Sequence, residues 1–96
     1  MGASPFITIA HGSTVQQAFN EAVEEACHEH GHGGYTGSLA EKSSFVRIPL
    51  PKDTKPHVEA NRLIDEDDDR ISDKWGPAGV FELGKGRWIF FGWAPS

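Results

Sequence analysis

The chain has 96 residues, which is enough for one domain with one hydrophobic core. Its hydrophobic share of 38%, with three Trp, one Tyr and six Phe, excludes a disordered chain. Nine Lys and Arg stand against fourteen Asp and Glu, a net charge of −5. This balance argues against binding to polynucleotides or anionic membranes, which needs a basic surface.

The sequence also lacks the features of membrane and secreted proteins. No apolar run approaches the roughly 20 residues that span a bilayer. The N-terminal residues lack the basic and apolar regions of a signal peptide. The single cysteine, Cys27, cannot form an internal disulfide, which suits a reducing compartment. We therefore expect a cytoplasmic protein.

The first two predicted elements are a short strand and a long amphipathic helix. Residues 6–10 are rich in β-branched side chains and lie between Pro5 and Gly12, which predicts a strand. Ser13 or Thr14 can cap a helix that begins directly afterwards. Apolar residues then recur with helical spacing and predict one continuous apolar stripe: Val15, Ala18, Phe19, Ala22, Val23, Ala26 and Cys27.

The middle of the chain predicts a β-hairpin and a second helix. We read residues 35–48 as two strands around a polar turn at residues 41–44, because a structureless loop of this length is unusual in a small domain. A proline-rich connection follows, and Thr54 is the predicted cap of a helix with proline in its first turn. That helix breaks within the acidic run at residues 65–69, and its apolar residues are Ala60, Leu63 and Ile64.

The last part of the chain predicts a second hairpin, with strands at residues 80–83 and 87–93 around a Gly-Lys-Gly turn. The Trp-Gly-Pro sequence at residues 75–77 ends the preceding helical region. The predicted element order is therefore β-α-β-β-α-β-β in one domain, residues 1–96. This order predicts an α+β fold with a mainly antiparallel sheet of about five strands, packed by two helices.

A segment rich in histidine and glycine, CHEHGHGGYTGS at residues 27–38, is the first candidate site. Phosphate-binding loops lead into a helix N-terminus, whereas these glycines follow a helix. His28 and His30 point in divergent directions on a helix, and Gly31 interrupts the i, i+4 pair of His28 and His32, so this pattern does not supply the three or four ligands of a zinc site. We interpret the segment as a helix end and expect no metal and no cofactor. The alternative is a pocket for a small molecule or nucleotide, or a small enzyme site, at His30, His32 and Tyr35.

The acidic run at residues 65–69 is the second candidate. If Asp65 began an EF-hand loop, Arg70 would stand where glycine is needed and Gly76 where glutamate is needed. We therefore interpret the run as a solvated helix end, with an acidic DNA mimic as an alternative. Because no catalytic constellation can be assembled from the sequence, we expect that the protein is not an enzyme.

The predicted strands divide into two faces, because alternate side chains of a strand point to opposite sides of a sheet. The first set is uniformly apolar and is the expected core: Ile7, Ile9, Val46, Ile48, Leu50, Phe81, Leu83, Ile89, Phe91 and Trp93. The second set mixes aromatic with charged and polar residues: Phe6, Thr8, Phe45, Arg47, Glu82, Trp88 and Phe90.

This second, aromatic set is the predicted binding surface. If both helices cover the first face, the aromatic set is exposed, and aromatic residues with arginine are typical of interface hot spots. We therefore predict binding of a host protein, or self-association, through one group of residues: Trp88, Phe90, Arg47, Phe45 and Phe6. The alternative is that the second helix covers this face.

Residues 24–45, EEACHEHGHGGYTGSLAEKSSF, with the later WGPAG and FFGWA, resemble small uncharacterised proteins encoded by actinobacteria and their phages. Those proteins carry a helix followed by an HGxGGYTG-xxAEK-like segment. The resemblance covers about half of the chain and brings no catalytic residues with it. It implies a phage or mobile-element origin. The most concrete form of the predicted function is then a phage-type modulator of a host protein.

Overall fold

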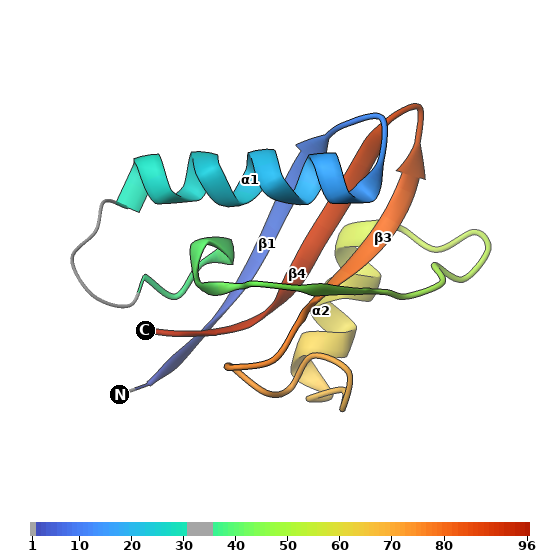
Figure 1. The fold of residues 1–96 in the computed structure, drawn as a ribbon. Helices are drawn as coiled ribbons and strands as arrows, with labels where there is room; N and C mark the ends of the chain where they lie inside the picture. Colours follow the sequence, from blue (N-terminus) through green and yellow to red (C-terminus); the bar gives the residue numbers. More distant parts are fainter. Residues whose placement is uncertain (1, 31–35) are drawn as a thin grey trace.

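The computed structural model describes residues 2–30 and 36–96, which form a four-stranded sheet between two α-helices (Figure 1). The spatial order of the strands is β1-β4-β3-β2. The elements in chain order are β1 (Ala3–His11), α1 (Val15–His30), the 3₁₀ helix η1 (Leu39–Glu41), β2 (Phe45–Arg47), α2 (Pro56–Asp65), β3 (Ala78–Gly84) and β4 (Arg87–Pro95).

Helix α1 and the C-terminal hairpin form where the sequence predicts them. Before α1, the Thr14 hydroxyl oxygen accepts the backbone N–H of Gln17 at 3.1 Å, the hydrogen bond of an N-terminal cap. Strands β3 and β4 are joined by a tight turn in which Lys85 and Gly86 both have positive φ angles. Glycine adopts this backbone conformation at no steric cost, which explains its place in the turn.

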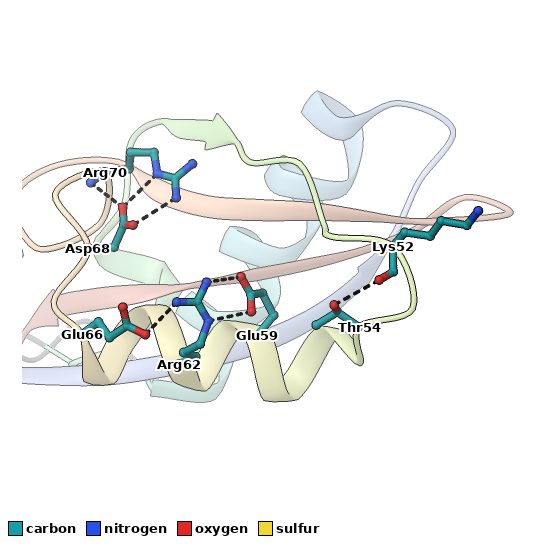
Figure 2. A network of polar contacts seen from close by, with 7 residues as sticks. All are labelled: Lys52, Thr54, Glu59, Arg62, Glu66, Asp68 and Arg70. Carbon is teal, nitrogen blue, oxygen red and sulfur yellow. Dashed lines mark hydrogen bonds and ion pairs between the residues drawn. The ribbon is translucent and has the colours of Figure 1, made fainter.

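Helix α2 is also confirmed, but its predicted cap is wrong. Pro56 occupies the start of the helix, where its missing N–H costs nothing. Lys55 stands at the cap position and makes no side-chain capping bond. The Thr54 hydroxyl instead donates to the Lys52 carbonyl at 3.4 Å (Figure 2). The helix ends at Asp65, at the start of the acidic run, as its composition predicts.

The sheet is mixed and has four strands, which corrects the prediction of about five mainly antiparallel strands. β4 is antiparallel to both β1 and β3, whereas β2 runs parallel to β3. The missing strand is the first arm of the predicted hairpin, whose described part contains η1. Here Ser38 accepts the N–H of Ala40 at 3.2 Å, and a Glu41 carboxylate oxygen accepts the hydroxyl of Thr36 at 3.0 Å. These local hydrogen bonds compete with strand pairing.

The two helices cover opposite faces of the sheet, which corrects the prediction that both cover one face (Figure 1). β1, β2 and β3 run in the same direction, so α1 connects β1 to β2 and α2 connects β2 to β3 as crossovers. Crossovers between parallel strands are right-handed in nearly all proteins. The first crossover runs from β1 at one edge of the sheet to β2 at the other edge, and the second runs back from β2 to β3. Two crossovers of the same hand that run in opposite directions across a sheet lie on opposite faces, so α1 and α2 cover different faces.

Each face of the sheet therefore has its own core, and the predicted division of residues between the faces is confirmed. The aromatic set packs beneath α1, where the ring centroid of Phe19 lies 5.0 Å from that of Phe45 and 5.5 Å from that of Phe90. The first set packs beneath α2, against Leu63 and Ile64, with one exception: Ile9, expected in the core, is 48% exposed because it lies on the edge strand β1. β4 lies between the two cores and is buried on both sides, which explains its continuous apolar run.

Phe90→Ala and Phe91→Ala should destabilise the domain to a similar extent, because both side chains are 0% exposed on opposite faces of β4. Truncation of a buried phenylalanine costs about 3–5 kcal/mol, a large part of the stability of a small domain. Urea unfolding measures the loss. The control Ile9→Ala removes a side chain that is 48% exposed and should cost about 1 kcal/mol or less. Near-wild-type stability of Phe90→Ala would contradict the position of α1.

Candidate functional site

The predicted aromatic binding surface lies inside the fold. Phe6, Trp88 and Phe90 are 8%, 6% and 0% exposed, and helix α1 covers them. Phe45 is half-buried, and of the five predicted binding residues Arg47 is the exposed one. The expectation that this face is open to a partner is therefore wrong. The face is covered by the first helix, whereas the sequence-based alternative placed the second helix there.

Arg47 contacts two side chains at the end of this face, Glu82 and Trp88. Its Nη2 atom donates to Oε1 of Glu82 at 2.6 Å, and its guanidinium carbon lies 5.4 Å from the ring centroid of Trp88. The indole Nε1 of Trp88 donates to the Gly12 carbonyl at 3.1 Å. Arginine thus lies over an aromatic ring and beside a carboxylate at the end of the core. These contacts give the mixture of aromatic and charged residues a structural explanation.

The histidine-rich segment is described only in part. His28 is exposed in the last turns of α1. The side chain of His30, together with His32 and Tyr35, lies outside the described residues, so the pocket predicted for these three residues stays a prediction. Across residues 2–30 and 36–96, no group of three or more His, Cys, Asp or Glu side chains is placed to hold a metal ion.

The continuation of this segment, residues 36–42, has a structural role. The Lys42 side chain is buried, and its Nζ donates to the carbonyls of Asp73, Lys74 and Gly76 at 3.4, 3.1 and 2.9 Å. Burial lowers the pKa of Lys42, and the charge of Asp73 partly opposes this shift. Lys42 therefore ties η1 to the loop before β3. This contact and the hydrogen bonds of Glu41 give the Ala-Glu-Lys sequence at residues 40–42 a structural role.

Two arginines pair with acids within and beside α2 (Figure 2). Arg62 donates to Glu59 at 2.9 Å and to Glu66 at 2.7 Å. The Nε and Nη2 atoms of Arg70 donate to the two carboxylate oxygens of Asp68 at 2.9 and 3.0 Å. These hydrogen bonds lower the pKa of Asp68 to about 2. The acidic run is thus partly neutralised, which weakens its interpretation as a DNA mimic.

Asp68→Asn should lower the free energy of unfolding by about 1 kcal/mol at pH 7, because it removes a charge-assisted pair on a partly exposed surface. The folded pKa of about 2 lies below the ordinary value of 3.8. The contribution of Asp68 is therefore complete above about pH 5 and is lost as the pH falls toward 2. Urea unfolding of the wild-type protein and Asp68→Asn gives the difference between their free energies of unfolding. This difference should fall to about half between pH 7 and pH 3. A difference that does not depend on pH would contradict this pairing.

The structure adds a site that the sequence did not reveal, a groove beside the edge strand β1. The C-terminal half of α1 extends past β1 (Figure 1), and a space of about 240 Å³ lies between the two elements. We call this space the β1 groove. Its lining consists of Thr8, Ile9, Ala10 and His11 from β1, Glu21, Ala22, Glu25, Ala26 and Glu29 from α1, and Ser38.

The outer side of β1 presents backbone groups that make no bond to the sheet. Gly2 and Ser96 exchange two backbone hydrogen bonds of 3.3 and 3.2 Å. Bonded and non-bonded pairs alternate in an antiparallel ladder, so the even-numbered residues of β1 bond β4 and the odd-numbered ones face outward. Ile7 and Ile9 therefore direct N–H and C=O away from the sheet, whereas Pro5 offers only its carbonyl. No hydrogen bond within residues 2–30 and 36–96 reaches these outward groups.

The wall of the β1 groove is acidic. Glu21, Glu25 and Glu29 are exposed and follow one another at intervals of four residues, so they share one side of α1. Within the described part of the chain, none of the three forms an ion pair. We call these three residues the acidic wall. Within residues 2–30 and 36–96 it places unpaired negative charge next to a sheet edge whose outward backbone groups are unbonded.

Comparisons with protein-family models, with curated proteins and with solved structures find no match to this chain. The resemblance to small phage-encoded proteins therefore stays a prediction. None of the described helices is long and apolar enough to cross a membrane. The β1 groove is consequently the feature of the molecule from which a function is inferred.

Proposed function

We propose that the protein is a small intracellular, non-enzymatic binding module that takes up an extended segment of a partner protein beside β1. The observation that carries this proposal is a nine-residue edge strand with outward backbone groups, next to a groove under α1. In strand addition, main-chain hydrogen bonds supply affinity, and pockets beside the strand supply specificity for side chains. The outward backbone groups of β1 can make the main-chain hydrogen bonds, and the β1 groove can receive the side chains.

The two edges of the sheet differ in a way that favours β1. Long open edges invite aggregation, and proteins usually shorten them or block them with proline or charge. The edge strand β2 has three residues, and prolines follow it at positions 49 and 51. β1 has nine residues and one outward proline, Pro5. A partner strand that pairs with Ile7, Ile9 and His11 therefore meets no proline on β1.

The proposed function is still the binding of a protein partner, as the sequence predicts, but the proposed binding surface is the β1 groove instead of the aromatic set. A phage-type modulator of a host protein remains its most concrete form. Phe6, Trp88 and Phe90 of the aromatic set are inside the core, so a partner cannot reach them without displacing α1. The β1 groove is open and needs no such rearrangement. Its use requires only that the partner segment can adopt an extended conformation.

Ile9→Pro should weaken partner binding at least tenfold relative to Ile9→Ala. Proline removes the outward N–H of residue 9 and leaves the β1–β4 hydrogen bonds in place, as Pro5 already does on the same side of β1. Alanine shortens the same side chain but keeps the N–H, so the comparison isolates the backbone group. The binding ligands are peptides that the wild-type protein selects from a random-peptide display library.

Thermal melting of both variants shows whether they are folded, and fluorescence anisotropy with the selected peptides gives the two affinities. Equal affinity of folded Ile9→Pro and Ile9→Ala for these peptides would contradict strand addition. A library from which the wild-type protein enriches no peptide would contradict it as well.

A further inference from the structure

The two sides of the β1 edge have different chemistry, and this difference specifies the partner segment. We infer that the segment is an amphipathic strand in which Lys or Arg alternates with aliphatic residues. The cationic side chains lie under α1, and the aliphatic ones lie on the α2 side, next to Ile9. The inference rests on the proposed function, because it names the chemistry of the segment that the β1 groove takes up.

The alternation follows from the pleat of the sheet. Successive side chains of an added strand point to opposite faces, as they do in β1. In β1, Phe6 and Ala10 belong to the core beneath α1, whereas Ile7 belongs to the core beneath α2. An added strand therefore directs every second side chain toward the acidic wall and the others toward the α2 side of the sheet.

The α1 side of the added strand favours long cationic side chains. The small residues Ala22 and Ala26 leave room between α1 and the sheet, and Thr8 offers a half-buried surface beside them. The aliphatic stem of Lys or Arg can lie along these residues while its charged end reaches the acidic wall. Among the described residues, no Lys, Arg or His side chain forms an ion pair with the acidic wall.

The α2 side favours an aliphatic neighbour. Ile9 is 48% exposed, although it lies within β1 and on the face that α2 covers elsewhere. Ile7, two residues earlier on the same face, is partly buried in that core. A β-branched or other aliphatic residue beside Ile9 would cover its exposed surface, since neighbouring side chains on one face of a sheet pack together.

The same features disfavour a second copy of this chain as the occupant. Two copies paired through antiparallel β1 edges form one continuous sheet about a two-fold axis, which places both α1 helices on the same face. Each α1 extends past its own β1, so the two helices would compete for the space above the joint. Their acidic walls would also approach each other, and charges of like sign repel.

The test uses the full chain and the fluorescent heptapeptide Lys-Val-Lys-Val-Lys-Val-Lys. Two control peptides replace every Lys with Gln, or keep the composition and group the residues as Lys-Lys-Lys-Lys-Val-Val-Val. Anisotropy titrations should show the alternating peptide binding at least tenfold more tightly than either control. The triple variant Glu21→Gln, Glu25→Gln, Glu29→Gln should lose this preference for lysine over glutamine.

A second triple variant provides the charge-matched control: Glu24→Gln, Asp65→Asn, Asp69→Asn. These acids are exposed and lie outside the lining of the β1 groove, so this variant should keep the tenfold preference. An equal loss in both triple variants would mean general electrostatic attraction and would overturn the inference. Equal binding of the alternating and the grouped peptides would overturn it too.

The failure of this inference can be told apart from the failure of strand addition. If the lysine and glutamine peptides bind equally well and both lose affinity in Ile9→Pro relative to Ile9→Ala, strand addition stands and the cationic segment is rejected. If the alternating peptide binds Ile9→Pro and Ile9→Ala equally well, strand addition itself is rejected. A dimer at micromolar concentration that Ile9→Pro abolishes would identify a second copy as the occupant and overturn the inference.

Discussion

The direction in which the chain crosses its sheet determines the arrangement of the other elements. α1 carries the chain from β1 at one edge to β2 at the other, and α2 carries it back to β3. With the right-handed crossover that parallel strands require, the two helices must lie on opposite faces. The space left between β1 and β3 is filled by β4, the last strand. Its side chains are therefore buried on both faces, and β1 remains at an edge.

The charged residues fall into two groups: those that make contacts within the fold, and those of the acidic wall. Lys42, Arg47, Arg62 and Arg70 all have acceptors or aromatic rings within the fold, and three of them pair with carboxylates. These contacts explain charges that looked functional in the sequence, including Arg47 and part of the acidic run. The acidic wall differs, because none of its three members is paired within the described residues. The β1 groove is thus distinguished by three carboxylates that form no ion pair within the described residues.

Much of the fold can be predicted from local patterns. The apolar spacing of α1, proline at the start of α2 and glycine in the β3–β4 turn each determine a local conformation. The alternation of side chains also divides the strand residues correctly between the two faces. This division does not show which helix covers which face. Trp88 and Phe90 were therefore assigned correctly to one face, and the expectation that this face is open was wrong.

The main error in the sequence-based prediction was the strand assigned to residues 35–40. In the described part of that segment, Thr36, Ser38 and Glu41 bond to one another, and such local bonds are hard to distinguish from strand patterns in a sequence. Without that strand the order becomes β-α-β-α-β-β. A parallel pair and helices on opposite faces then follow from crossover handedness, and the opposite-face arrangement would have been predictable.

The β1 groove could not be predicted for a related reason. Thr8 and Ala10 are ordinary strand residues, and Glu21, Glu25 and Glu29 are ordinary on the polar face of a helix. Their importance arises only when α1 crosses the sheet and extends past β1. One signal was present in the sequence, since α1 carries four glutamates and no Lys or Arg. That composition indicates a helix face without internal charge compensation.

The most direct test of the account is amide hydrogen exchange along β1, followed by NMR in the free protein and with a bound peptide. In the free protein, the N–H groups of Thr8 and Ala10 should exchange slowly because they bond β4, and those of Ile7 and Ile9 should exchange fast. Bound peptide should slow Ile7 and Ile9 to the rates of their neighbours. Equal protection of all four amides in the free protein, or fast exchange of Ile7 and Ile9 in the complex, would contradict an open edge that receives a partner strand.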